Sequence, residues 1–328
     1  MITKLRLIYG DGFDPYRNLA VEQVLLEQAD AGECILYLWQ NRQTVVIGRN
    51  QNAWRECRLS DLTQDSGHMA RRLSGGGAVF HDLGNLNFTF LVQKKDYDLE
   101  KQLGVVVEAC RSLGIPAEKS GRNDVLSGGR KFSGNAFYDT AGRAYHHGTL
   151  LVDVDMGALE RYLRPSRAKL ESKGVESVRS RVVNLRELKP DLTIEALKSA
   201  MANAFESVYG LKAQLLETTE LDTGRVSELT ERNESWKWLL GQRLAFTVAC
   251  EQRFPWGELE LEFKIENGIV EDVCVWTDAM DWSFAQPLGD SLRGARFSSE
   301  GLAVRLYASG IPPEIRNCAM RLLTEQAF

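Results

Sequence analysis

The sequence has few cysteines and histidines, and neither is grouped as a structural metal site requires. Its six cysteines are scattered over 328 residues without a C-x-x-C pair, and it holds only four histidines. We therefore expect no disulfide framework and no zinc site. The scattered cysteines also indicate that the protein resides in a reducing compartment. Long apolar runs of 18 or more residues are absent, and the N-terminus, MITKLRLIYGDGF, shows no signal-peptide pattern. These absences predict a cytoplasmic protein with no membrane partner.

The chain also lacks an excess of basic charge. It contains 40 lysines and arginines against 45 aspartates and glutamates, a formal net charge of −5. A nucleic-acid-binding domain would be expected to be basic, so no nucleic-acid partner is expected. Hydrophobic residues make up 44% of the chain and charged residues 26%, which is typical of a globular protein. The length favours about two domains.

Hydrophobic patterning predicts an α+β fold. The predicted helices lie near 16–30, 99–113, 193–209 and after Pro312-Pro313, and the predicted strands at 34–39, 44–48, 86–92 and 145–154. Strands often follow one another directly, which favours mixed sheets over strict alternation with helices.

A hairpin signal marks the C-terminal part. Gly257 through Thr277 is typical of two strands joined at Asn267-Gly268. We place a domain boundary near 241–249, with a large domain over residues 1–242 and a small domain over residues 250–328.

Three consecutive glycines follow an arginine pair in the segment RRLSGGGAVFHD, residues 71–82. Glycines let a large ligand approach backbone N–H groups closely, and arginine offers planar donors suited to phosphate or carboxylate. The alternative is a simple glycine turn between strands. The segment is not a Walker loop, because it has no Gly-Lys-Ser/Thr. It is not a dinucleotide fingerprint either, because Phe80 stands where a third glycine is needed.

Three further segments carry candidate residues, each with a plainer alternative. In GGRKFSG (128–134), which follows Asn123-Asp124, Lys131 lies between glycines, although a strand lysine usually faces solvent and Asn-Asp can be a turn. His146-His147 opens an apolar strand and is either functional or a packed, hydrogen-bonded pair. Residues 164–181 hold six basic residues against two acids. They form either a solvated loop or a mobile flap that folds over an anionic ligand.

In combination and order, these segments resemble bacterial lipoate–protein ligase A. The segments are RRLSGGGAVFHDLGNLNF, GRNDVLSGGRKFSGNAF, YHHGTLLVDVD and KGVESVRSRVVNL, preceded by FDPYRNLAVEQVLL and LWQNRQTVVIGRNQNAWRE. The resemblance covers essentially the whole chain. It implies a large α+β catalytic domain of the biotin/lipoate ligase type, with mixed sheets and surrounding helices, plus a small C-terminal α/β domain. Phe132 departs from the family's usual branched aliphatic residue, and the loop between Asp124 and Lys131 is short.

The resemblance implies an ATP-dependent ligase that converts free lipoic acid to lipoyl-AMP and releases pyrophosphate. The lipoyl group would then pass to a lysine of the lipoyl domains of 2-oxoacid dehydrogenase E2 subunits or of the glycine cleavage H protein. ATP and Mg²⁺ would be required, with Asp124 as the protein partner of the metal.

The resemblance also implies site roles. Lys131 would be catalytic and would contact both lipoate and ATP. Residues that would bind ATP or lipoyl-AMP are Arg72, Ser74, Gly75, Gly76, Gly77, Ala78, Val79, Phe80, Asn123, Asp124, Lys131 and His147. The lipoate pocket would be lined by Trp39, Leu19, His81 and Lys131, and the adenylate flap would use Arg164, Lys173, Arg179 and Arg181.

Rival interpretations remain. An octanoyltransferase of the same fold needs a nucleophilic cysteine near its site, and no cysteine lies in the four segments. A biotin ligase fits less well, because the arginine–glycine segment does not match that family's usual pattern. A catalytically idle protein that binds lipoyl-AMP or lipoyl domains is the alternative from a different class.

Overall fold

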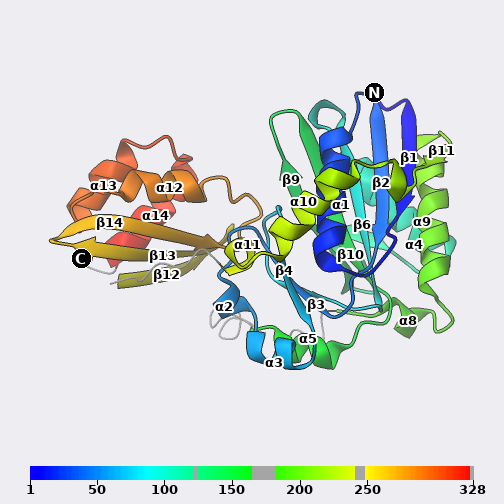
Figure 1. Ribbon diagram of the computed structural model, residues 1–328, viewed down its shortest axis with the longest axis horizontal. Coiled ribbons are helices and arrows are strands. Elements are labelled where there is room, and N and C mark those ends of the chain that lie inside the picture. Colours follow the sequence, from blue (N-terminus) through cyan, green and yellow to red (C-terminus); the bar gives the residue numbers. More distant parts are fainter. Residues whose placement is uncertain (122–123, 165–181, 241–247, 326–328) are drawn as a thin grey trace. The chain divides into compact units, whose positions relative to one another are not determined.

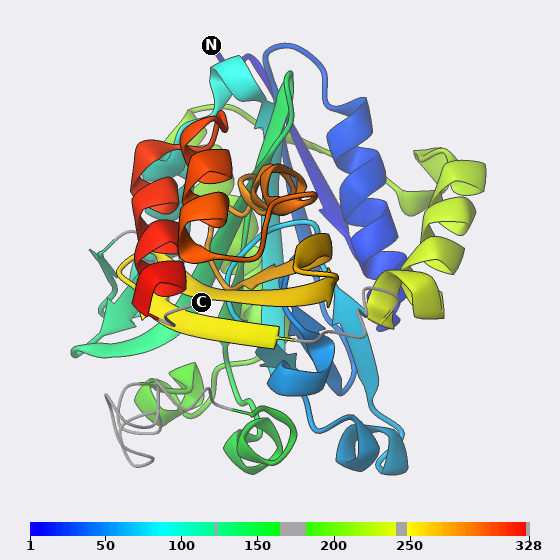
Figure 2. The same ribbon diagram turned by 90° about the vertical axis from the view of Figure 1, so that its left-hand side faces the viewer.

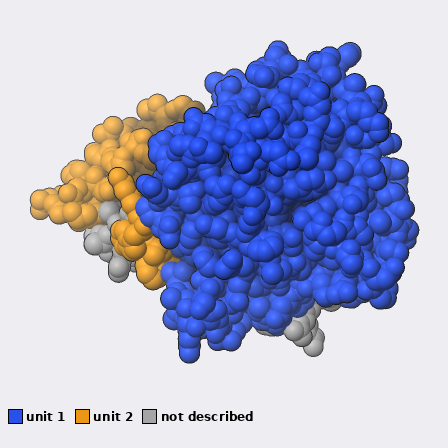
Figure 3. Space-filling view, turned by 45° about the vertical axis from the view of Figure 1, so that its right-hand side comes forward, with its two compact units in different colours: residues 1–46, 57–70, 79–235 blue, residues 47–56, 71–78, 236–328 orange. Residues whose placement is uncertain are grey.

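The structure is a computed structural model that describes residues 1–121, 124–164, 182–240 and 248–325 (Figure 1). The chain divides into two compact units (Figure 3). Unit 1 comprises Met1–Val46, Cys57–Ala70 and Val79–Ser235, and unit 2 comprises Ile47–Glu56, Arg71–Ala78 and Trp236–Phe328. The arginine pair and the three glycines of the segment RRLSGGGAVFHD therefore belong to unit 2, and the segment continues from Val79 in unit 1. The predicted boundary near 241–249 lies outside the described residues except at 248–249.

Unit 1 is built on an eight-stranded mixed sheet. In spatial order its strands are β11 (Ala213–Leu215), β1 (Lys4–Tyr9), β2 (Glu33–Trp39), β6 (Asn85–Gln93), β10 (Arg143–Leu151), β9 (Arg130–Asp139), β8 (Asp124–Ser127) and β7 (Glu118–Ser120). β1 runs parallel to β11 and β2, and the pairs from β2 to β7 are antiparallel. The mixed α+β architecture predicted from the sequence is confirmed.

Alternate residues on each strand point to opposite faces of this sheet. On β2, Leu36 and Leu38 join a hydrophobic core with α4 (Leu99–Ser112) and α9 (Ile194–Tyr209). Between them, the Tyr37 hydroxyl points the other way and donates to Asn18 Oδ1 on α1 (Pro15–Gln28) at 3.1 Å. We call this second side the α1 face. α10 (Thr223–Glu234) packs against α1 (Figure 1).

The principal helices begin and end where the sequence supplies caps. Asp14 and Asp98 accept from backbone N–H groups at the starts of α1 and α4, and Pro15 is the first residue of α1. α9 begins at the Thr193 cap and ends at Gly210, which has a φ of 68°. The predicted helices near 16–30, 99–113 and 193–209 are confirmed.

A second, three-stranded sheet has the order β4 (His68–Arg71), β3 (Thr44–Ile47), β5 (Val79–His81). The short helices described before α10 are α2 (Ala53–Glu56), α3 (Leu59–Gln64), α5 (Met156–Tyr162) and α8 (Leu185–Leu188), and 3-10 turns lie at Lys94–Asp96 and Thr218–Glu220.

Among the residues that the structure describes, no helix combines the length and the apolarity needed to span a bilayer.

Unit 2 contains a three-stranded antiparallel sheet and helices that cover one face of it (Figure 2). The strands are β12 (Val248–Phe254), β13 (Gly257–Glu266) and β14 (Ile269–Thr277), and the covering helices are α12 (Ala285–Leu292), α13 (Ser299–Tyr307) and α14 (Pro313–Glu325). The short helix α11 (Trp236–Leu240) precedes the sheet in the chain. Asn267 and Gly268 have φ of 52° and 74°, as a tight hairpin turn with both central residues left-handed requires. The predicted hairpin and the helix after Pro312-Pro313 are confirmed.

The opposite face of this sheet buries carboxylates. Glu260 and Glu262 are 5% and 6% exposed and alternate on β13 with core leucines. Arg55 Nη2 lies 2.9 Å from Glu260 Oε1, and Trp276 Nε1 donates to Glu262 Oε2 at 2.8 Å. Burial raises the pKa of Glu260 to about 8, because it outweighs the opposing charge of Arg55.

We predict that Glu260→Gln stabilises the protein relative to the parent at alkaline pH. Between the ordinary pKa of 4.5 and a folded-state pKa of about 8, the folded chain keeps a proton that the unfolded chain has released. The free energy of unfolding of the parent should therefore fall as pH rises through this window, and the amide does not titrate. Thermal unfolding from about pH 5 to about pH 9 tests this, with Glu266→Gln at the exposed end of β13 as control. Parallel curves for parent and Glu260→Gln would contradict it.

Candidate active site

A bulge in β9 brings Lys131 and Asp124 to the same face of the sheet. Asp124 pairs with Gly134 and Leu126 with Lys131, so between these pairs β9 has one residue more than β8. Residues that oppose one another share a face, which places Lys131, Gly134 and Asp124 together. Without the extra residue, Lys131 would oppose Ser127 and point to the other face. Lys131 Nζ lies 2.6 Å from Asp124 Oδ1, and both side chains are about one-third exposed, at 35% and 34%.

Gly134 leaves space beside the ammonium group of Lys131. A Cβ at position 134 would lie 3.0 Å from both Cε and Nζ of Lys131 and 3.9 Å from Thr149 Oγ1. The Gly134 N–H donates to Thr149 Oγ1 at 3.4 Å. An oxygen atom of a ligand placed over Gly134 would therefore lie within reach of a cation.

The adjacent histidines point to opposite faces of β10. His146 Nε2 is 2.8 Å from Asn135 Oδ1, and its ring packs in the core against Phe88, with ring centroids 5.4 Å apart. Burial, with a smaller effect of His147, lowers the pKa of His146 to about 3, so this ring is neutral at neutral pH. His147 Nδ1 is 2.8 Å from Glu22 Oε1 on the α1 face. The pair lies in mid-strand rather than at its start, because β10 begins at Arg143 and ends at Leu151.

Glu22 connects His147 to Trp39 through buried hydrogen bonds. The Thr89 hydroxyl donates to Glu22 Oε1 at 2.7 Å and lies 3.1 Å from Trp39 Nε1, which donates to it. Glu22 is 2% exposed. The network fixes both aromatic rings on the α1 face. We did not predict Glu22 or Thr89, although a carboxylate within the apolar helix sequence LAVEQVLL and a threonine within the strand LNFTFLV are visible signals.

The structure brings two of the predicted lipoate-pocket residues together. Trp39 and His81 are in edge-to-face contact, with ring centroids 6.2 Å apart. Asn41 Nδ2 lies 3.2 Å from His81 Nδ1 and so restrains that ring. Leu19 is buried on α1, one turn before Glu22.

Strand register aligns these side chains across the sheet. Trp39 on β2 opposes Asn87 on β6, Asn87 opposes Thr149 on β10, and Thr149 contacts Gly134 on β9. We call Lys131, Gly134, Thr149, Asn87 and Trp39 the cross-sheet row. It spans three strand spacings of about 4.8 Å, with a cation at one end and an aromatic ring at the other.

In unit 2, Arg72 holds the loop that contains the three glycines, and Arg71 ties it to neighbouring segments of the same unit. Arg72 Nη2 donates to the carbonyl oxygens of Gly75 and Gly77 at 2.7 and 2.8 Å, and its Nε donates to Ser74 Oγ at 3.0 Å. Arg71 is 3% exposed. It donates to five backbone carbonyls, those of Gly48, Arg49, Gln51, Trp238 and Leu239. Burial lowers the pKa of Arg71 to about 10, so it stays charged at neutral pH.

Close packing requires two of the three glycines. A Cβ on Gly75 would lie 2.2 and 2.3 Å from the carbonyl oxygens of Ala279 and Met280. Gly76 has a φ of 88°, and its N–H donates to the Ala279 carbonyl at 3.0 Å. In this structure these two residues serve the packing of unit 2. Gly77 leads into Ala78, from which the chain enters β5.

On β5, Val79 pairs with Val46 and the Phe80 ring is buried against Tyr162, with ring centroids 5.6 Å apart. Phe80 could therefore meet a nucleotide only through its backbone. Of the other predicted residues, Asn123, Lys173, Arg179 and Arg181 lie outside the described residues. Arg164 is described and is exposed after the end of α5.

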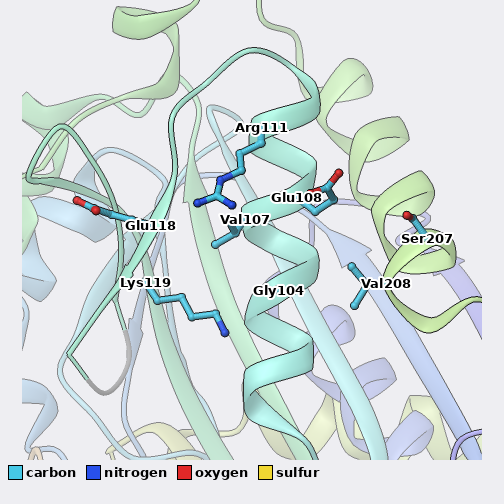
Figure 4. Close-up of a pocket in the computed structure, with 8 residues that line it drawn as sticks. All are labelled: Gly104, Val107, Glu108, Arg111, Glu118, Lys119, Ser207 and Val208. Atoms are coloured by element: carbon cyan, nitrogen blue, oxygen red, sulfur yellow. The ribbon is translucent and has the colours of Figure 1, made fainter.

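A cavity of about 580 Å³ opens on the α4 and α9 side of the sheet (Figure 4). Arg111 of α4 points across it toward the strand that carries Glu118 and Lys119. None of the residues that the sequence predicted for ATP or lipoate line this cavity.

The six cysteines are free thiols outside the cross-sheet row. Burial is the main cause that raises the pKa to about 12 for five of them, Cys34, Cys57, Cys110, Cys250 and Cys274. A thiolate is the nucleophilic form, so these residues are poorly suited to carry an acyl thioester.

The sequence and the fold both match known proteins. Residues 14–206 match the family model of the lipoyl protein ligase A/B catalytic domain, and residues 243–319 match that of the bacterial lipoate protein ligase C-terminus. The fold is similar to P. falciparum LipL1 in complex with lipoate, with 26% identity, coverage of 97% of this chain and 99% of the other, and a TM-score of 0.84.

Two further solved structures match the larger part of the chain. A lipoate-protein ligase A bound with ATP shows 26% identity, coverage of 74% and 100%, and a TM-score of 0.64. A bipartite lipoate protein ligase from Thermoplasma acidophilum, described with its E2 lipoyl domain, shows 27% identity, coverage of 76% and 100%, and a TM-score of 0.66. The catalytic-domain match alone covers more than half of the sequence, and the chain belongs to the lipoate protein ligase family.

Proposed function

We propose that this protein adenylates lipoate with ATP and transfers the lipoyl group from lipoyl-AMP to a lysine of a lipoyl domain. The observation that carries the proposal is the Lys131 ammonium, held by Asp124 beside the bare Cα of Gly134. It lies at one end of a row that ends at Trp39. A long apolar acid with one charged end matches that arrangement. The relatives described with lipoate, with ATP and with an E2 lipoyl domain support it.

In the first step, a carboxylate attacks the α-phosphate of ATP, and the two anions repel each other. A fixed cation at the new bond lowers this barrier more directly than a general base does. Lys131 is a compact ammonium with three donors, so it suits a position between carboxylate and phosphate oxygens. Its ion pair with Asp124 holds it there before the substrates bind.

We assign each of the remaining predicted residues to the nucleotide, the acyl group or the acyl-adenylate according to the chemistry of its side chain or backbone. We assign the segment from Arg72 to Phe80 to the nucleotide, because its arginine and its backbone N–H groups are phosphate donors. Trp39, His81 and Leu19 are assigned to the acyl group, because an alkyl chain and a dithiolane ring require an apolar lining. His147, whose ring is held by its bond to Glu22, is assigned to the acyl-adenylate.

Magnesium would accompany the nucleotide and neutralise phosphate charge. The described residues contain no cluster of three or more carboxylate, histidine or cysteine ligands. A nucleotide-bound magnesium takes most ligands from phosphates and water and needs only one or two carboxylates. Asp124, beside Lys131, fits that requirement, and we propose it as the partner.

In the second step, the acceptor lysine attacks the acyl carbon and AMP leaves. Only about one free lysine in two thousand is neutral near pH 7, given an ordinary pKa near ~10.4, so the acceptor must lose a proton in the site. The basic residues from Arg164 to Arg181 are proposed to cover the adenylate and limit its hydrolysis. Lipoyl domains of E2 subunits and the glycine cleavage H protein are the proposed acceptors.

Pyrophosphate exchange tests the proposal. Exchange between ATP and labelled pyrophosphate that requires lipoate would support adenylation, and transfer to a purified lipoyl domain would support the second step. Acyl transfer from a carrier thioester without ATP would instead favour the octanoyltransferase alternative, which the raised thiol pKa values disfavour. Binding of lipoyl-AMP without turnover would favour the alternative of a catalytically idle binding protein.

We predict that Lys131→Ala folds normally but loses roughly 10²–10³ in the rate of lipoate-dependent exchange, because preorganised charge is lost at the reacting centre. Lys119→Ala is the matched control: Lys119 lies on β7 and pairs with Glu100 at 2.5 Å. Exchange by Lys131→Ala near the parent rate would show that the assignment is wrong.

We predict that Gly134→Ala slows exchange roughly ten- to hundredfold without unfolding the chain. The new Cβ would lie 3.0 Å from Lys131 Nζ and displace it. Gly142→Ala is the control, because nothing lies within 4 Å of its added Cβ. A folded Gly134→Ala variant with unchanged exchange would mean that Lys131 does not act from this position.

We predict that Trp39→Ala widens acyl selectivity toward carboxylic acids with bulkier tails, by about tenfold in relative kcat/KM. Trp39 is 3% exposed, and its removal opens space at the far end of the row. The readout is exchange across a series of acids, with Trp39→Phe as a variant that keeps an aromatic ring. Unchanged preference in a folded variant would remove Trp39 from the acyl site, and an unfolded variant would make it a core residue only.

A further inference from the structure

Asn87 is a buried polar side chain in the cross-sheet row to which the mechanism above gives no role. It is 2% exposed and stands between Trp39 on β2 and Thr149 on β10. Its Nδ2 has no hydrogen-bond partner among the described residues. Buried N–H groups are nearly always paired, so an unpaired one in a candidate site points to a ligand that supplies an acceptor.

A neighbour on the same strand occupies one end of this amide. Asn85 is fully buried, and its Nδ2 donates to Asn87 Oδ1 at 2.9 Å. The carbonyl end of Asn87 is therefore occupied, and the NH₂ end is left for a ligand. The indole N–H of the opposing Trp39 already donates to Thr89. Asn87 is thus the side chain in this part of the row that offers a donor.

The position of Asn87 along the row identifies which part of the substrate it meets. With the substrate carboxylate at Lys131, the acyl chain runs over Gly134 and Thr149. Its far end then lies beside Asn87 and Trp39, which are directly opposed. The far end of lipoate is a dithiolane ring, whose sulfur atoms are weak hydrogen-bond acceptors. A plain alkyl acid has no acceptor there.

We propose that Asn87 determines acyl specificity by donating a hydrogen bond from Nδ2 to a dithiolane sulfur. The inference rests on the proposed function. An alkyl tail would remove water from the amide without replacing its hydrogen bond, so Asn87 acts mainly by rejecting sulfur-free acids. One neutral hydrogen bond of this kind corresponds to a discrimination of about three- to tenfold.

The test compares two acids of the same shape on two proteins. The acids are lipoate and its carbocyclic analogue, in which methylene groups replace both ring sulfurs. The proteins are the parent and Asn87→Leu, with Asn203→Leu on the exposed side of α9 as control. The readout is kcat/KM in ATP–pyrophosphate exchange. The parent and the control should prefer lipoate by about three- to tenfold, and Asn87→Leu should use both acids equally.

The outcomes separate this inference from the function on which it rests. Equal use of both acids by the parent would overturn it, and that comparison needs no variant. A preference for lipoate that survives in folded Asn87→Leu would also overturn it, because the sulfur would then be recognised elsewhere. Absence of exchange with either acid in the parent would contradict the proposed function, and therefore also the inference that rests on it.

Discussion

The position of one cation in unit 1 depends on a one-residue bulge in β9. Ordinary alternation would turn Lys131 to the face that carries the hydrophobic core with α4 and α9, where an ammonium group would lose its hydration. The extra residue places Phe132 and Ser133 between the two register pairs, buries the Phe132 ring in the core and brings Lys131 across to Asp124. The ion pair with Asp124 and the position of Lys131 beside Gly134, at one end of the cross-sheet row, follow from that shift.

The two faces of the sheet have different compositions: one packs the hydrophobic core, and the other carries the candidate site residues. One face is a continuous apolar core in which even the histidine at 146 is held neutral. The α1 face carries Glu22, Thr89 and His147, whose buried hydrogen bonds fix the rings at the far end of the row. Because buried polar groups are costly when unpaired, this network specifies one arrangement of side chains rather than many. The cross-sheet row therefore has a rigid apolar end at Trp39 and a fixed charged end at Lys131. This arrangement suits a substrate that has an apolar tail and a charged head.

Much of the fold follows from the sequence, because periodicity and caps are local. The helix after Asp14-Pro15, the buried strand CILYLW and the Asn267-Gly268 turn are each set by neighbouring residues. The bulge is not, since nothing in GGRKFSG marks which residue is extra. Local signals also cannot distinguish His146 from His147, because their faces are decided by pairing with β6 and β9. The packing of Gly75 against Ala279 depends on residues far apart in sequence.

The family resemblance supplied most of the candidate residues, and the structure gives several of them a different local role. Arg72 holds the loop in which it lies, Gly75 and Gly76 pack against the segment that follows β14, and the Phe80 ring is buried. Glu22 and Asn87 lie within the segments that carry the resemblance, and Thr89 directly follows one of them, but their roles depend on cross-strand register and hydrogen bonding. Their partners are distant in sequence, so pattern alone does not connect them.

In the proposed reaction, a lipoate carboxylate that is positioned by Lys131 attacks the α-phosphate of ATP. Lipoate labelled with oxygen-18 in its carboxyl group tests this directly in a complete reaction with ATP and a lipoyl domain. Attack by the carboxylate makes one of its oxygens the bridge to phosphorus, and that oxygen departs with AMP when the lysine forms the amide. We expect AMP that carries one labelled oxygen and pyrophosphate that carries none. Lipoylated acceptor formed with unlabelled AMP would contradict it.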